Sequence, residues 1–181
     1  MSTYTPISTQ TLTSTAATVT FSGIPQTYTD LVIVVNGAIS SGLANLYIRY
    51  NGDIATNYSY TYLDGSGTVA SSGRSSNNDK ITANNYGYFS TTTDTNYILQ
   101  FQNYANTTTN KTCIARSNAA SNGVSAVVGL WRSTAAINRI DLSTSSSTFA
   151  SGSTFTLYGI GSGSPKAFGG DEVRTDGTYW Y

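Results

Sequence analysis

Nine acidic side chains are the residues of this chain best suited to chemistry, because the sequence contains no histidine. The missing histidine removes the usual general base, the Ser-His-Asp and Cys-His arrangements and the commonest metal ligand. Two carboxylates alone can hydrolyse a glycosidic bond. However, most of the acids stand at strand edges or in turns, where turn chemistry explains Asp53, Asp64 and Asp176. Asp171 and Glu172 lie in a tail that offers nothing to hold them in register. We predict no catalytic residues and no enzyme activity.

The sequence predicts no metal site and no cofactor. The single cysteine, Cys113, excludes an intrachain disulfide and lies in a strand-like run, so we expect a buried small apolar residue. The glycines at 159, 161 and 163 precede a Ser/Pro linker, whereas dinucleotide and phosphate loops need a helix after the glycines. A calcium loop needs acids at alternate positions, and residues 64–67 supply only Asp64.

Tyrosines are the most suggestive side chains. Tyr58, Tyr60 and Tyr62 alternate along one strand and therefore share one face. One interpretation is that they form half-buried cross-strand pairs. The other is an aromatic contact surface for a protein or a sugar ring, because tyrosine buries area while it keeps a polar tip. The chain ends on Tyr179, Trp180 and Tyr181, which we assign to the same candidate contact surface.

The composition indicates how these side chains are positioned. Only 10% of the 181 residues are charged and close to a third are Ser or Thr, but Tyr, Val and Ile are also abundant. Such residues fit a pleated, half-buried surface and not a disordered chain. The net charge is zero and no basic patch is visible, so we expect neither nucleic-acid binding nor membrane attachment. No stretch approaches the ~20 apolar residues of a membrane span. Zero net charge also removes a barrier to self-association.

Short strand-like runs, bounded by Gly, Asn, Asp and Ser, recur along the chain. Their number and spacing predict an all-β, jelly-roll-like antiparallel β-sandwich of about nine to eleven short strands. The runs are at residues 18–21, 31–35, 46–50, 58–62, 81, 86–89, 97–102, 112–116, 125–131, 137–142 and 154–160.

Several local expectations follow from residue type. The continuously apolar run 31–35 predicts a central strand covered on both faces. Asn51-Gly52 predicts a hairpin. Residues 65–79, almost all Gly, Ser and Asn, are predicted to be a loop, and residues 133–136 allow one helical turn at most.

We divide the chain into a β-sandwich domain at 1–160, a Gly/Ser/Pro linker at 161–170 and a hairpin-like extension at 171–181. The extension either docks on another subunit or is the start of a further domain. The first ten residues have neither a basic nor an apolar region, so we expect no signal peptide and assembly in a cytoplasm.

Several segments together resemble a family of small β-domains in virion proteins of tailed bacteriophages, of the fibre, tail or capsid decoration type. The segments are 4–12 (YTPISTQTL), 19–25 (VTFSGIP), 28–31 (YTDL), 129–131 (GLW), 135–137 (AAI) and 149–160 (FASGSTFTLYGI). Residues 169–181 resemble the opening of a glycine-rich distal domain of phage fibres. The resemblance implies a jelly-roll-like component of a phage particle and no catalytic residues.

These observations predict a non-enzymatic structural component of a virion, assembled in the host cytoplasm. The leading hypothesis is a fibre or adhesin-like domain, trimeric by analogy, that contacts other virion proteins and a host-surface glycan. The alternative is a capsid decoration (cement) protein on the outer shell. The Gly-rich tail favours the first and the lack of an N-terminal docking helix favours the second. A glycan-degrading appendage enzyme is the least favoured class.

Overall fold

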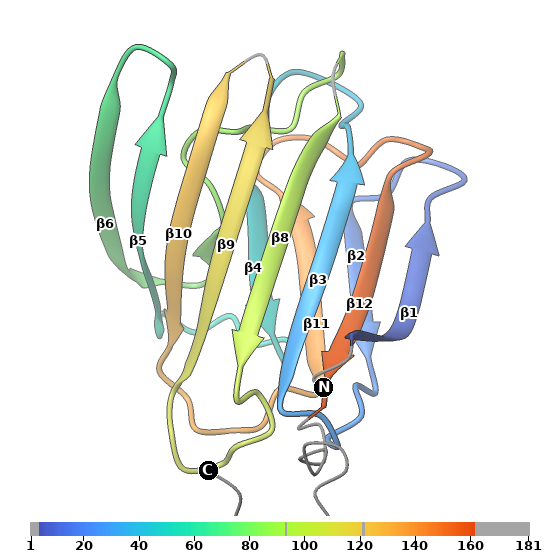
Figure 1. Cartoon of the computed structure of the whole chain (residues 1–181), viewed down its shortest axis with the longest axis vertical. Helices are drawn as coiled ribbons and strands as arrows, with labels where there is room; N and C mark the ends of the chain where they lie inside the picture. Colours follow the sequence, from blue (N-terminus) through green and yellow to red (C-terminus); the bar gives the residue numbers. More distant parts are fainter. Residues whose placement is uncertain (1–3, 93, 121, 162–181) are drawn as a thin grey trace, which may run out of the picture.

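The computed structural model describes residues 4–92, 94–120 and 122–161. This part of the chain forms twelve β-strands and no helix, and residues 133–136 are irregular. The strands are β1 (Tyr4–Thr11), β2 (Thr18–Ser22), β3 (Asp30–Gly37), β4 (Leu46–Tyr50), β5 (Tyr58–Gly65), β6 (Ala70–Asn78), β7 (Ile81–Thr82), β8 (Thr95–Gln102), β9 (Lys111–Ala119), β10 (Gly123–Trp131), β11 (Arg139–Thr144) and β12 (Thr154–Ile160) (Figure 1).

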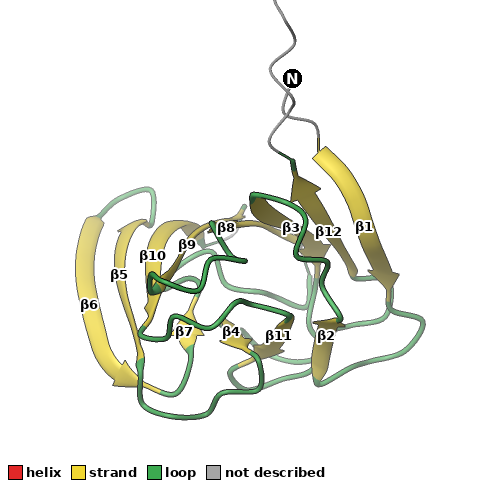
Figure 2. Cartoon of the chain, turned by 90° about the horizontal axis from the view of Figure 1, so that it is seen from below, coloured by secondary structure: helices red, strands yellow, loops and turns green. Residues whose placement is uncertain are grey.

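The strands form two antiparallel sheets. The large sheet has the order β1-β12-β3-β8-β9-β10-β5-β6, and the small sheet has the order β2-β11-β4-β7. Figure 2 shows the small sheet facing one side of the large sheet. The predicted all-β antiparallel sandwich is therefore confirmed, while its jelly-roll topology stays a prediction. The sequence did not predict strands β1 and β6, and residues 86–89 form a loop with a single bridge at Phe89.

The core lies between the two sheets. It is filled by every second side chain of the strands, because successive side chains point to opposite faces of a sheet. On β9 every second side chain from Lys111 to Ala119 is buried, and β8 follows the same rule. Phe149 contacts both Phe89 and Phe155, with ring centroids 5.6 and 4.9 Å apart. Each such aromatic pair contributes about 0.5–1.5 kcal/mol beyond the area that it buries.

Strand β3 is central, as predicted, but only one of its faces is fully covered. Leu31, Ile33 and Val35 point into the core and are fully buried. On the opposite face Val32 is buried, whereas Val34 is 38% exposed. The run of apolar residues therefore marks a strand with a core on one side and a partly open apolar face on the other.

Asn51-Gly52 forms a tight turn but not the predicted hairpin. Both residues have positive φ (53° and 70°), and the amide of Asp53 donates to the carbonyl of Tyr50 at 2.9 Å. Strand β4 before the turn belongs to the small sheet, whereas β5 after it belongs to the large sheet. The chain crosses between sheets here because Tyr50 and Tyr58 both point into the shared core, with ring centroids 6.1 Å apart.

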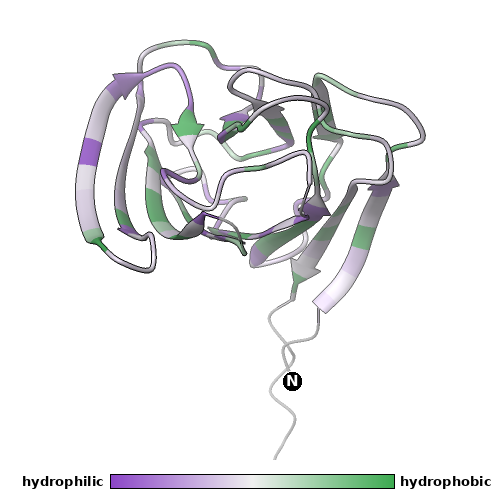
Figure 3. Cartoon of the chain, turned by 90° about the horizontal axis from the view of Figure 1, so that it is seen from above, coloured by the Kyte–Doolittle hydropathy of each residue, from purple (hydrophilic) through white to green (hydrophobic). Residues whose placement is uncertain are grey.

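Residues 65–79 do not form the predicted loop, because Ala70–Asn78 is strand β6, which pairs with β5 at the edge of the large sheet. Figure 3 shows this outermost strand, at the left, with very few apolar residues. An edge strand needs only the backbone hydrogen bonds of its neighbour and buries few side chains. Its composition therefore carries little strand signal.

The chain enters and leaves the sandwich at the same end. Tyr4, at the start of β1, lies opposite Ile160, at the end of β12. Of the predicted linker 161–170 and extension 171–181, only Gly161 is among the described residues. The division of the chain at residue 160 stays a prediction.

Candidate interaction surface

The predicted tyrosine face points inward. Tyr58, Tyr60 and Tyr62 do share one side of β5, but this is the side that faces the core. Tyr58 is fully buried and stacks on Trp131 at 6.1 Å with an interplanar angle of 16°. Burial raises the pKa of the Tyr58 hydroxyl to about 12. Tyr58 is therefore a core residue and contributes nothing to a contact surface.

Tyr60 and Tyr62 are half-buried and pack against the edge of the core. Tyr62 lies directly opposite Gly73 of β6, and a Cβ at Gly73 would overlap the Tyr62 ring. The hydroxyl end of the Tyr62 ring therefore lies over Gly73. The rest of the predicted surface, Tyr179, Trp180 and Tyr181, lies outside the described residues.

A different surface stands out on the side of the large sheet that faces away from the small sheet, here called the outer face. Six aliphatic side chains on β3, β5, β8, β9 and β10 are exposed there by more than a third: Val34 38%, Leu63 64%, Ile98 37%, Ile114 37%, Val124 53% and Val128 54%. Strand pairing sets Val34 beside Ile98 and Ile114 beside Val128. The outer face therefore exposes apolar side chains on neighbouring strands. Exposed apolar patches of some size mark interaction sites.

Two arginines lie among these side chains. Arg116 stands between Ile98 and Ala126 in the cross-strand row, and Arg74 lies opposite Thr61 at the sheet edge. Neither guanidinium forms an ion pair or a hydrogen bond with a described residue, whereas Arg49 and Arg139 both bind carboxylates. A shallow hollow lined by Leu63, Ile98, Arg116 and Val124 crosses the face. The outer face thus combines apolar area with two cations that have no counterion.

The sequence carries a signal for this face that the tyrosine pattern obscured. A strand with one solvated face alternates apolar and polar residues. Here Tyr97-Ile98-Leu99, Cys113-Ile114-Ala115 and Val127-Val128 interrupt the alternation with apolar residues at outward positions. Three adjacent strands with this interruption indicate apolar side chains on both faces.

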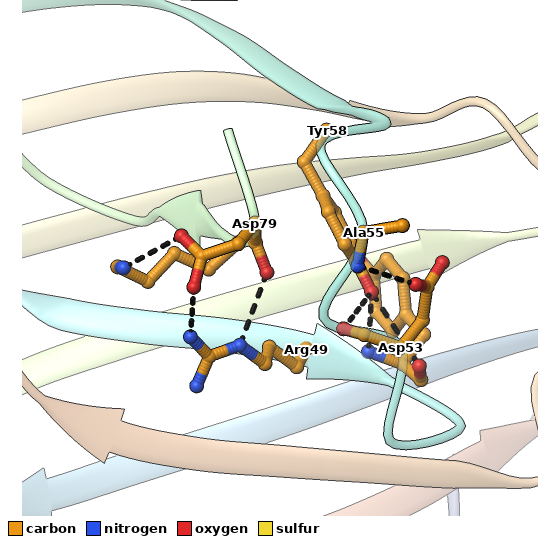
Figure 4. A network of polar contacts seen from close by, with 7 residues as sticks. Arg49, Asp53, Ala55, Tyr58 and Asp79 are labelled. Carbon is orange, nitrogen blue, oxygen red and sulfur yellow. Dashed lines mark hydrogen bonds and ion pairs between the residues drawn. The ribbon is translucent and has the colours of Figure 1, made fainter. Parts of the chain in front are cut away.

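Asp53, Asp64 and Asp79 fix turns and loops, and Figure 4 shows Asp53 and Asp79. Asp53 accepts hydrogen bonds from Trp131 Nε1 at 2.6 Å, from the amide of Ala55 at 2.8 Å and from Asn57 Nδ2 at 2.9 Å. Burial raises the pKa of Asp53, but these hydrogen bonds outweigh it, so the pKa lies below its ordinary value. A carboxylate of this kind stays ionised and is a poor proton donor.

Asp79 and Asp64 have comparable structural roles. Asp79 binds Lys80 Nζ at 2.7 Å and the guanidinium of Arg49, and these two cations hold the pKa of Asp79 below its ordinary value despite partial burial. Asp64 is only 6% exposed and accepts from Asn85 Nδ2 at 2.8 Å and from the Ser125 hydroxyl. Asp64 thereby ties the loop that follows β7 to the large sheet.

Cys113 is buried, as predicted. Burial raises the pKa of its thiol to about 11, so the reactive thiolate is disfavoured near neutral pH. Within the described ranges, no group of three or more His, Cys, Asp or Glu side chains is arranged to hold a metal ion. The same residues include no helix long and apolar enough to span a membrane.

No protein-family model, no curated protein and no solved structure matches this chain. The candidate surface is therefore defined by its own geometry: an exposed apolar sheet face with two arginines that have no counterion among the described residues.

Proposed function

We propose that this chain is a non-enzymatic structural component of a bacteriophage virion, a fibre or adhesin-like domain that contacts neighbouring proteins through its outer face. The observation that carries the proposal is that face, with six exposed aliphatic side chains on five adjacent strands. Such a surface suits a subunit that is covered in an assembly. The phage particle is inferred from the resemblance of the sequence to virion β-domains.

The chemistry of the outer face favours a protein as its occupant. Its apolar side chains are Val, Ile and Leu, which pack against other aliphatic groups, whereas sugar rings stack on aromatic side chains. Arg116 and Arg74 favour a partner surface that brings carboxylates. The host-glycan contact that the sequence predicts stays a prediction, because Tyr60 and Tyr62 lie on the core-facing side of β5.

A second candidate function is capsid decoration. The pairing of Tyr4 with Ile160 brings both ends of the sandwich to one place, which favours decoration over an in-line fibre segment. A domain attached at one end projects from its support and does not continue a shaft. A module on the outer shell and a terminal head on a fibre both meet this condition. An in-line fibre segment does not.

Gold-labelled antibody against the purified chain, applied to phage particles that contain it, tests the two assignments by electron microscopy. Label at the tail supports the fibre domain, and label spread over the capsid supports decoration. Absence of label from intact and from gently disrupted particles contradicts both.

Incorporation into particles tests the role of the outer face. Ile114→Glu places an uncompensated charge in the apolar surface, so we expect loss of the chain from particles while the fold persists. Thr112→Glu is the matched control, because Thr112 is an exposed outward residue of the same strand. Equal incorporation of both variants argues against the outer face as a contact.

The non-enzymatic part of the proposal has its own test. We expect purified chain to release no reducing ends from host-surface polysaccharide. Turnover that disappears when Asp53 or Asp64 is changed to Asn, in a variant that still folds, would overturn it.

A further inference from the structure

Strand β6 is the longest edge strand in the described part of the large and small sheets, and it is regular from Ala70 to Ser76. It pairs with β5 only, so the backbone groups along its other side have no strand partner. The opposite edge strand, β1, contains Pro6 and a register irregularity between Pro6 and Ser8, both of which hinder strand addition. The edges of the small sheet are short, with five residues in β2 and two in β7.

The regular part of β6 can pair with a second copy of itself. Its regular part is Ala70–Ser76, because Asn77 has a φ of 58° and lies where the register with β5 shifts. Gly73 is the centre of this segment. A two-fold axis perpendicular to the sheet, midway between Gly73 and Gly73 of a second copy, pairs the whole segment with its counterpart. Residues that face each other then point to the same side of the sheet, as antiparallel pairing requires.

Charge also favours this register. With the axis at Gly73, Arg74 faces Ser72 of the second copy, and Ser71 faces Ser75. An axis one residue further on would set Arg74 against Arg74, and like charges directly opposite are destabilising. Arg74 has no ion pair within the described residues that would prevent this contact.

Tyr62 supplies a second reason for an axis at Gly73. Its ring crosses Gly73, and its hydroxyl lies where a side chain of Gly73 would begin. Two copies related at Gly73 bring both Tyr62 hydroxyls toward the axis. Neither hydroxyl has a hydrogen-bond partner among the described residues of its own chain, so each is free to bond across the contact.

We infer that β6 adds to β6 of a second copy of this chain, which joins two large sheets into one continuous antiparallel sheet. The inference rests on the proposed function, since it gives the structural domain a defined self-contact. It names a two-fold contact, whereas the sequence analogy predicts a trimer. The outer faces of the two copies then lie on the same side of one sheet and form a single larger surface.

Sedimentation equilibrium of the full chain tests the inference through charge at one position. Ser72→Glu sets a carboxylate opposite Arg74 of the second copy at two symmetric places, and Ser72→Arg sets a cation there. We expect a dimer that Ser72→Glu tightens and Ser72→Arg weakens, each by roughly 2- to 30-fold in Kd. Ser76→Glu and Ser76→Arg are the matched controls, because Ser76 faces Ala70 in this register, and we expect less than about a 2-fold change.

The outcomes separate this inference from the proposed function. A chain that stays monomeric at high concentration, a trimer, or a dimer insensitive to charge at position 72 overturns the β6 contact. Particle labelling tests the proposed function independently and is unaffected by any of these results. Circular dichroism of each variant establishes that an altered Kd does not arise from unfolding.

Discussion

The two faces of the large sheet are built from the same strands but differ in whether the chain covers them. On β8, Leu99 is fully buried against the small sheet, whereas its neighbour Ile98 is 37% exposed on the outer face. Both are large aliphatic residues, so residue type does not separate the faces. The difference is that the inner face is already covered within the chain, while the outer face has no cover among the described residues. The inner face therefore determines stability, and the outer face is available for association.

Truncation of neighbouring residues on β8 gives the largest contrast. We expect Leu99→Ala to lower the free energy of unfolding by about 2–5 kcal/mol, because it leaves a cavity in a packed core. Ile98→Ala should cost no more than about 1 kcal/mol, since its side chain already contacts solvent. Urea denaturation of both variants measures the difference. Equal costs would show that the outer face is covered in the isolated chain.

The loss of stability at alkaline pH should depend on Cys113, which lies on the inner face, and not on its outer-face neighbour Ile114. Its pKa is about 11 in the folded chain and about 9 when exposed, so the folded state holds the proton more tightly. The contribution of the buried thiol to the free energy of unfolding is therefore fully present below pH 9. It is lost as the pH rises toward 11, by up to roughly 3 kcal/mol. Cys113→Ala should remove this part of the loss in thermal unfolding between pH 9 and 11. Ile114→Ala, on the outer face, should keep the wild-type pH profile.

Removal of a carboxylate tests the turn before β5. Asp53→Ala leaves Trp131 Nε1 and Asn57 without their acceptor, so we expect a cost of about 1–3 kcal/mol in the free energy of unfolding. Asp94 is exposed, and Asp94→Ala should change stability by less than about 0.5 kcal/mol. Chemical denaturation of the pair measures the contrast, and a negligible cost for Asp53→Ala would mean that water replaces the lost acceptor.

The smallest effect on stability is expected on the outer face itself. Ile114→Thr with Val128→Thr keeps the β-branched shape and removes apolar area, so the free energy of unfolding should change by no more than about 1 kcal/mol. Binding of a hydrophobic dye to the folded chain should fall. Unchanged dye binding would place the exposed apolar surface elsewhere.

Much of the fold could be predicted from the sequence because alternation reports directly on strands. The pattern of Tyr97, Leu99 and Phe101 predicts β8 and its buried side correctly. For the tyrosines on β5 alternation is insufficient, because a period of two indicates which residues share a face but not which face is covered. Tyr58 was assigned to a contact surface and lies in the core.

Strand β6 and the extent of the outer face could not be predicted, for different physical reasons. Strand β6 has almost no apolar residues because an edge strand depends on backbone hydrogen bonds and buries little. The outer face depends on which strands become neighbours, as when Val34 of β3 meets Ile98 of β8. Such pairings join residues that are far apart in the chain, and no local pattern encodes them.

The pairing of Tyr4 with Ile160 has a mechanical consequence. Tension applied through both ends of the sandwich pulls β1 and β12 apart at their shared end, so the hydrogen bonds of that pair break one after another. Tension applied between one end and the outer face loads many strand pairs together, in shear. The domain should therefore unfold at a low force when it is pulled by its two ends. It should unfold at a higher force when it is pulled between one end and the outer face. A particle that uses it under load must hold it by the sheet.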